Sequence, residues 1–363
     1  MLAIQSDKII EELHAIVAAA TRAPSGDNTQ PWRFDVNAAE LCIDVRLDPS
    51  RDLSPMNSGQ RMSLIACGAA IENALSVARE QCWQSRLEFP EVAWTEELES
   101  CPLVARIRLE HQFGHASDRA ARIVAARVTN RRMYDARPVP AELLADLESA
   151  VPARDGIRAH WIGERGRLEA LADVIARSDG ILFSEPSMRA AFLANVRFDL
   201  PADAEAESGL PLAALEADAG VRASMRVMKR LPQAAFKLLG MRAIFTSHAR
   251  KLIRSASGLC VLTVESESPT AELHVGRAMQ QAWLALTERG LAAQPMMSAM
   301  VLDCALHHGS PELIEALKRQ NTAATLADFR AELERAGISG RPAFLLRFGY
   351  AAAPSGRTGR RQP

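Results

Sequence analysis

The sequence lacks the features that mark several large classes of protein. Its formal net charge is −1, so the overall charge gives no reason to expect nucleic acid as a partner. No apolar run is long enough to span a membrane, and the start has no basic segment followed by an apolar one. We therefore expect no membrane span and no secretory signal.

The cysteines and the usual nucleotide motifs are equally uninformative. Six cysteines are scattered without CxxC spacing or neighbouring histidines, which favours buried thiols in a reducing compartment, by default the cytoplasm, and no metal site. There is no Walker loop, no GxGxxG after a strand and no GxSxG elbow. A P-loop, a Rossmann nicotinamide site and a hydrolase nucleophile elbow therefore have no support.

The chain is large enough for more than one core. At 363 residues, 48% of them hydrophobic and 24% charged, it exceeds the size at which one core keeps growing. Two core-bearing units are the natural expectation. Apolar spacing predicts the following order of elements: helix 8–20, strand 41–46, helix 59–82, strand 103–109, helix 117–127, helix 141–151, strand 158–162, helix 165–177, strand 258–264, helix 271–289 and strand 343–350.

The order of elements recurs in outline after Pro140. The two longest helices share a pattern of small and apolar residues that opens at Gly68 and at Gly276. Small residues permit close helix packing, which suits a buried central position. We interpret residues 1–126 and 127–363 as two α+β copies of one ancestral unit. A chance likeness of the two helices is the alternative.

One stretch, about residues 180–257, has no counterpart in the first half. Its second part, 221–254, holds nine Lys and Arg residues and no Asp or Glu. Three readings are open: a helical insertion with a solvated basic face, a lid over an anionic cofactor, and a membrane-surface or partner-binding helix pair.

Two polar segments are candidates for a binding site. In RAPSGDNTQPWRF, residues 22–34, a helix ends and a turn begins whose short polar side chains can face a polar ligand. In RVTNRRMYD, residues 127–135, three guanidinium groups beside a hydroxyl and an amide could bind a phosphate. An ordinary helix-to-strand turn and a solvated basic linker are the respective alternatives.

The first segment resembles a known signature. RAPSGDNTQPWRF is similar to the APSxxNxQPW motif of the FMN-dependent nitroreductase family, in which this turn contacts the flavin. The matching residues, in the same spacing, are Pro24, Ser25, Asn28, Gln30, Pro31 and Trp32. The resemblance implies that Arg22, Pro24, Ser25, Asn28 and Gln30 bind FMN.

The second segment resembles the RRSxRxF…PVP opening of the same family, whose arginines and hydroxyl hold the FMN phosphate and ribityl oxygens. The resemblance gives these roles to Arg127, Thr129 and Arg131, or to Asn130 and Arg132 if the register shifts by one residue. One extra residue before Tyr134 leaves both registers open.

Two further segments are similar to the family. Residues 290–298 resemble the segment whose backbone N–H groups approach flavin N5, which implies cofactor contacts by Gln294, Pro295, Met297 and Ser298. Family members often have an acidic residue and Gly at the last two positions, so this chain departs there. The tail resembles the closing arm that returns basic residues to the phosphate, which implicates Arg360 and Arg361. A simple apolar turn and a disordered basic tail are the alternatives.

Each of these segments occurs once, and together they would complete one site. The resemblance is to the fused, two-repeat (Acg-like) branch, which implies an α+β fold of two nitroreductase-like repeats, each a mixed sheet flanked by helices, joined as a pseudo-dimer with a helical lid insertion. It also implies an FMN-dependent oxidoreductase that passes two electrons from NAD(P)H to a small acceptor. No catalytic side chain is assigned, because the flavin carries the chemistry. Since the fusion contains the dimer interface, we expect a monomer. The alternatives are a non-catalytic FMN-binding or sequestering protein and a partner-binding protein that uses the basic insertion.

Overall fold

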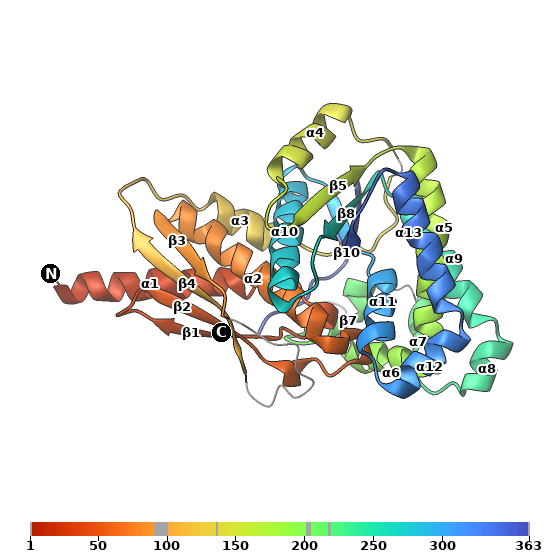
Figure 1. Cartoon of the computed structure of the whole chain (residues 1–363). Coiled ribbons are helices and arrows are strands. Elements are labelled where there is room, and N and C mark those ends of the chain that lie inside the picture. The colour runs from red at the N-terminus through yellow and green to blue at the C-terminus, as the bar shows by residue number, and fades with distance from the viewer. Residues whose placement is uncertain (1, 91–100, 136, 201–204, 217–218, 362–363) are drawn as a thin grey trace.

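The computed structural model describes residues 2–90, 101–135, 137–200, 205–216 and 219–361. It is an α+β fold in which two four-stranded antiparallel sheets are flanked by helices (Figure 1). The strands of the first sheet, in spatial order, are β1 (Trp32–Asn37), β2 (Cys42–Leu47), β4 (Leu103–His111) and β3 (Trp83–Glu88). Those of the second are β5 (Ile157–Ile162), β8 (Gly258–Val264), β10 (Arg341–Gly349) and β9 (Ala292–Pro295).

The two sheets have the same topology. In each, the second strand along the sheet is followed in the chain by a long helix, α2 (Arg61–Glu80) or α10 (Pro269–Glu288), and then by the opposite edge strand. The last strand of each unit, β4 or β10, lies between the two strands that the helix connects. It is antiparallel to both of them. The expectation of mixed sheets was therefore wrong. In neither of these two sheets do the strands that the long helix connects lie next to each other as a parallel pair.

The helices α2 and α10 cross in close contact through their glycines. A Cβ atom on Gly68 would lie 2.0 Å from the carbonyl oxygen of Leu273, and one on Gly276 would lie 2.0 Å from that of Ile65. Leu273 and Ile65 each precede the glycine of their own helix by three residues. The contact is thus reciprocal, as in an interface between two equivalent surfaces.

Polar contacts between α2 and α10 are reciprocal in the same way. Gln280 donates to Asn73 Oδ1 at 2.6 Å, and Gln281 donates to Glu72 Oε1 at 2.7 Å. Glu72 and Gln280 each follow their helix's glycine by four residues, and Asn73 and Gln281 by five. Each of these hydrogen bonds is therefore the counterpart of the other, which supports the two-copy interpretation.

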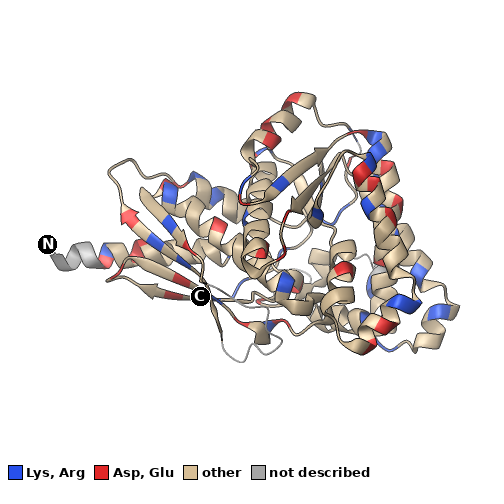
Figure 2. Ribbon diagram, in the orientation of Figure 1, with Lys and Arg blue, Asp and Glu red and all other residues tan. Residues whose placement is uncertain are grey.

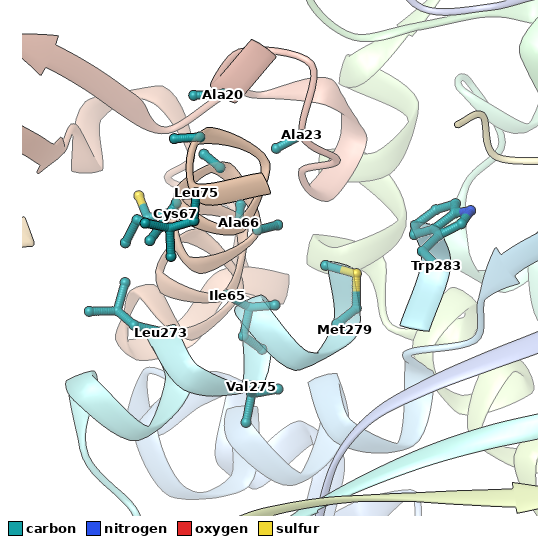
Figure 3. Packing of buried hydrophobic residues seen from close by; sticks show 14 of the residues in the cluster. Ala20, Ala23, Ile65, Ala66, Cys67, Leu75, Leu273, Val275, Met279 and Trp283 are labelled. Carbon is teal, nitrogen blue, oxygen red and sulfur yellow. The ribbon is translucent and has the colours of Figure 1, made fainter. Parts of the chain in front are cut away.

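One apolar core runs through both sheets and the helix pair. It joins Ile43 and Ile107 of the first sheet to Leu262 and Leu346 of the second. Figure 3 shows members of this core, with Ile65 and Ala66 from α2 and Leu273, Val275 and Met279 from α10. Because the two halves share this core, separation of the halves would expose it to water.

Other helices and 3-10 turns complete the molecule. Those of the first part are α1 (Leu2–Ala20), η1 (Gly26–Asn28), η2 (Pro49–Arg51), η3 (Pro55–Gln60), α3 (Arg119–Ala126) and α4 (Ala141–Ala150). A second core lies among α5 (Arg165–Ser184), α11 (Ser298–His308), α12 (Pro311–Arg319) and α13 (Thr322–Arg335). The segment without a counterpart forms α6 (Pro186–Asn195), β6 (Val196–Arg197), β7 (Leu210–Pro211), η4 (Leu212–Leu215), α7 (Ala219–Met228), α8 (Gln233–Leu238) and α9 (Met241–Arg254).

Most expected elements form within a few residues of the predicted bounds. The helix predicted over 165–177 is longer, and α5 extends into the start of the segment that we expected to be the insertion. Residues 201–204 and 217–218 of that segment lie outside the described residues. Strand β3 and the helices α11–α13 were not anticipated. None of the helices in the described ranges is long and apolar enough to cross a membrane.

Gly68→Ala should destabilise the protein, because the new methyl group would meet backbone atoms that cannot move independently of α10. We expect the free energy of unfolding to fall by at least about 2 kcal/mol, measured by urea denaturation. Gly166→Ala in α5 is the matched control, since its Cβ would meet nothing closer than 3.7 Å. Equal stability of the two variants would contradict the close crossing of α2 and α10.

Candidate functional site

A cleft that is partly open to solvent lies where four segments distant in sequence converge. They are the turn after α1, the segment after α3, residues 210–214 and the C-terminal tail. Eight of the residues expected to bind a cofactor line it: Arg22, Pro24, Ser25, Asn28, Arg127, Thr129, Arg131 and Arg360.

The turn at 25–30 is held by its own polar groups. Gln30 donates its backbone N–H to Ser25 Oγ at 2.9 Å, and Thr29 donates to the Gly26 carbonyl at 2.9 Å. Asp27, Asn28 and Gln30 have φ angles of 45°, 59° and 55°, in the left-handed region that non-glycine residues rarely occupy. Clustered left-handed residues are frequent at ligand sites, where surrounding contacts maintain the strain.

Arg127 joins the turn to the segment after α3. Its Nη2 donates to the Arg22 carbonyl at 2.9 Å, and its guanidinium lies 4.7 Å from the centre of the Trp283 ring. Asn130 donates its N–H to the Ala293 carbonyl at 3.0 Å, next to an isolated parallel bridge between Thr129 and Ala293. The backbone of β9 therefore positions the arginine segment at the cleft.

Arg131 contacts the segment 210–214, and Arg360 contacts the turn after α1. Arg131 Nη1 donates to the Ala214 carbonyl at 2.8 Å. Arg360 donates to Asn28 Oδ1 at 3.1 Å, and its Nη2 donates to the Arg22 and Ala23 carbonyls at 3.3 and 3.2 Å. These hydrogen bonds satisfy part of each guanidinium but do not neutralise its charge.

Positive charge accumulates in the cleft, and the charge of Glu205 near Arg360 offsets it only in part. Burial lowers the pKa of Arg127, as do the charges of Arg360, Arg22 and Arg357. Burial, and then Arg22, lowers the pKa of Arg360 to about 10, which leaves it charged at neutral pH. Within the described ranges, no carboxylate forms an ion pair with any of these four arginines. We define them as the arginine cluster.

Two buried N–H groups of the arginine cluster are unsatisfied. Among the described residues, Arg127 Nε and Arg360 Nε have no hydrogen-bond partner although both atoms are buried. An unpaired buried donor costs about 1–3 kcal/mol, and a buried charge without a partner costs more. Unsatisfied donors and uncompensated positive charge are together what a phosphate or other bidentate anion would satisfy.

A cover lies over the turn, formed by residues 205–216. Asn28 donates to the Ala206 carbonyl at 3.3 Å, and Leu210 and Ala214 line the cleft. Among described residues of the basic stretch 221–254, none lines the cleft. The segment over the cleft is therefore N-terminal to the stretch whose charge suggested a lid.

Three other expected site residues hold the cover and the tail in place. Gln30 donates to the Glu207 carbonyl at 2.6 Å and accepts the Arg361 N–H at 3.0 Å. Arg132 contacts Glu216 at 3.4 Å and donates to Ser355 Oγ at 2.7 Å. Gln30, Arg132 and Arg361 therefore act on the segments that enclose the cleft.

The expected residues of 294–298 do not line this cleft. Gln294 accepts a hydrogen bond from Arg347 Nε at 2.8 Å, behind the arginine segment. Met297 packs against both apolar cores, and Ser298 begins α11. Neither these residues nor Pro295 is among the lining residues, and their contact with a cofactor stays a prediction.

Several residues that matter here have no recognisable signal in the sequence. Trp283 lies on the central helix, where its pattern resembles ordinary core. Leu210 and Ala214 carry no polar group. Asp27 lies inside the recognised turn, but its pairing with the distant Asp52 depends on the fold.

Asp27 of the turn and Asp52 form a pair of acidic residues. Burial, together with the charge of Asp27, raises the pKa of Asp52 to about 6. Burial also raises the pKa of Asp27, although Asn195 donates to its Oδ2 at 3.2 Å and Arg131 lowers it. Ionisation of both carboxyls is therefore unfavourable in the folded chain.

Asp52→Asn should change how stability depends on pH. The folded pKa of Asp52 is raised, so its contribution to stability is present below the unfolded pKa of about 4 and is lost as pH rises through about 6. Between pH 4 and 7 the free energy of unfolding of the wild type should fall by about 1–3 kcal/mol more than that of Asp52→Asn, measured by urea unfolding. The Asn oxygen can still accept the Ser54 N–H, which lies 3.2 Å from Asp52 Oδ1.

Glu110→Gln, at an exposed position on β4, is the control for this experiment and should keep the wild-type pH dependence. A wild-type slope in Asp52→Asn would show that another group titrates there.

Comparison with known proteins shows a distant similarity to nitroreductases. No family model matches it. It is 27% identical over 351 residues to Uncharacterized protein MT1398 of Mycobacterium tuberculosis, a match that covers 94% of this chain and 46% of that protein. It is 29% identical over 163 residues to Putative NAD(P)H nitroreductase Rv3131 of the same species, covering 44% and 45%. The matches thus span about half the length of these relatives.

Solved structures of nitroreductases are similar to part of the chain. The FMN-bound nitroreductase of Bacteroides fragilis is 15% identical, with 64% of this chain and 88% of that chain covered and a TM-score of 0.33. The FMN-dependent nitroreductase NfnB of Mycobacterium smegmatis, in complex with NADPH, is 16% identical, with 64% and 87% covered and a TM-score of 0.32.

Proposed function

We propose that this chain is a member of the nitroreductase superfamily that binds one FMN in the cleft and transfers two electrons from NAD(P)H to a small acceptor. The observation that carries the proposal is the arginine cluster, in which Arg127 is buried and the Nε donors of Arg127 and Arg360 are unsatisfied. Its residues come from the two segments that resemble the family's phosphate-binding and flavin-binding motifs, and from the tail. The distant similarity to Rv3131 supports the same assignment.

The residues that line the cleft fit FMN by their chemistry. Arg127 and Arg360 would hold the phosphate, with Thr129 and Arg131 beside them. Ser25 and Asn28, on the turn after α1, would hold the polar part of the flavin.

Bound FMN would supply the two-electron chemistry, and the protein's residues bind, orient and shield it. The arginine cluster provides fixed positive charge, so it needs no rearrangement to bind an anion. The left-handed turn fixes the positions of Ser25 and Asn28. The cover and the tail limit the access of water to the cleft. No acid–base side chain is required by this scheme.

The internal helix pair supports a monomer within this proposal. The reciprocal contact of α2 and α10 already buries equivalent surfaces against each other inside one chain. We also propose the cytoplasm as the compartment, since all six cysteines are free.

One observation favours a second candidate, a non-catalytic FMN-binding or sequestering protein. The cover and the tail are both hydrogen-bonded to Gln30, across the mouth of the turn. If they do not open, a bound flavin cannot meet its electron donor.

Arg127→Met should weaken FMN binding about 10- to 100-fold while leaving the FMN-free protein at least as stable as wild type. The substitution removes a buried charge that has no counterion, and Met can still pack on Trp283. Isothermal titration with FMN and thermal unfolding of the FMN-free protein measure the two effects. Arg131→Ala should weaken FMN binding in the same direction.

Arg86→Met, at an exposed position on β3, is the matched control and should alter neither quantity. Undiminished FMN affinity in both cleft variants would contradict the phosphate assignment.

Anaerobic addition of NADH or NADPH should bleach the flavin band of the purified, FMN-loaded protein. Later addition of a nitroarene or a quinone should restore the band, because the acceptor takes the two electrons. Stopped-flow absorbance measures both phases. Bound flavin that neither cofactor bleaches would support the sequestering protein instead. A protein that takes up no FMN at all would contradict both candidates.

A further inference from the structure

The helices α8 and α9 meet at a corner with an unusual surface. Residues 237–244, KLLGMRAI, form this corner, with Gly240 at a φ of 62° between the two helices. Every residue of it except Met241 is exposed. We name residues 237–244 the basic–apolar corner. Figure 1 shows α8 at the rim of the molecule, on the side away from the first sheet.

Large aliphatic side chains of the corner extend into solvent. Leu238 is 88% exposed, Leu239 60% and Ile244 56%, and Val227 of the neighbouring α7 is 61% exposed. These four are a large part of the exposed large hydrophobic residues of the described chain, and they come from one short stretch. A concentration of exposed apolar residues on a soluble surface marks an interaction site.

The corner is anchored on a packed aromatic base and is not a loose end. Phe236 is buried, and Phe245 stacks on Phe183 of α5 with ring centres 4.6 Å apart. The Arg189 guanidinium lies 3.9 Å from the Phe236 ring centre. Because the inward face of both helices is already filled, Leu238 and Leu239 cannot turn into the core.

Basic residues surround the apolar tip. Arg226, Lys229, Arg230, Lys237 and Arg242 are all exposed. Within the described chain, acidic partners occur only farther along α9, where Arg250 and Arg254 contact Asp173. Figure 2 shows Lys and Arg on the helices at this end of the molecule. These five side chains therefore carry local positive charge, although the net charge of the chain is −1.

We propose that the basic–apolar corner docks on the surface of an anionic lipid bilayer. The exposed aliphatic side chains of the corner would enter the boundary between headgroups and acyl chains. The exposed Lys and Arg side chains near them, which we call the basic ring, would contact anionic headgroups. A bilayer is favoured over a folded protein because the tip projects at the rim of the molecule and combines exposed aliphatic side chains with exposed basic ones. It is favoured over nucleic acid because the exposed tip is aliphatic and offers no aromatic ring for stacking on a base.

The full chain should sediment with vesicles of phosphatidylcholine and phosphatidylglycerol in equal parts, and at least about tenfold less with phosphatidylcholine alone. Raising the salt from about 0.05 M to about 0.5 M should release most of the bound protein, because the basic ring is screened. This binding does not depend on FMN, so it tests the surface independently of the cleft.

Two double variants separate the apolar and basic contributions. Leu238→Asn with Leu239→Asn, and Lys237→Gln with Arg242→Gln, should each reduce binding to the anionic vesicles about tenfold or more. Phe113→Asn is the control: Phe113 is fully exposed after β4 and should not contribute. The changed side chains are on the surface, and thermal unfolding would verify that each variant is folded.

Three results would overturn the proposal. One is the absence of binding to anionic vesicles at low salt. Another is unchanged binding in both double variants. The third is retention on single-stranded DNA without vesicle binding, lost in the Lys237→Gln, Arg242→Gln variant, which would assign the surface to nucleic acid.

Discussion

The close crossing of α2 and α10 is the constraint on which the rest of the molecule depends. With glycines at both contact points, the two helices approach to a distance at which backbone touches backbone. That approach lets a single core extend from one sheet to the other. It also places Trp283, on α10, under the guanidinium of Arg127. The geometry of the cleft is in this sense a consequence of the helix crossing, because one wall belongs to the turn after α1 and the other to a segment held by the second sheet.

The apolar core stabilises the folded chain, whereas the cleft contains like charges that destabilise it. Four arginines converge there, of which Arg127 is buried, and their charges oppose one another without an ion-paired carboxylate among the described residues. A folded chain tolerates such an arrangement when the remaining contacts are strong, and local instability of this kind is typical of binding sites. The acidic pair of Asp27 and Asp52 adds a second group of the same kind beneath the turn. The stability of the core permits both.

Local patterns predicted much of the fold and of the cleft, whereas long-range contacts could not be read from them. The turn at Ser25 and Asn28 was recognisable because short polar residues beside Gly and Pro favour turns, and Arg127 because arginines cluster in its segment. Strand β3 was missed because its polar residues continue directly from α2. The antiparallel sheets were missed because the position of β4 between β2 and β3 is a property of topology. The cover at 205–216 lies within the segment expected to form the lid insertion, but its hydrogen bonds to the turn could not be read from the sequence.

The double engagement of Gln30 has a kinetic consequence. One end of its amide holds the backbone at Glu207, and the other end accepts the N–H of Arg361. The two segments are therefore coupled through a single side chain, and departure of either one leaves the amide half satisfied. Opening of either segment breaks one of these hydrogen bonds. The rate at which a molecule beneath them exchanges would therefore depend on how often the segments open, as well as on its own contacts.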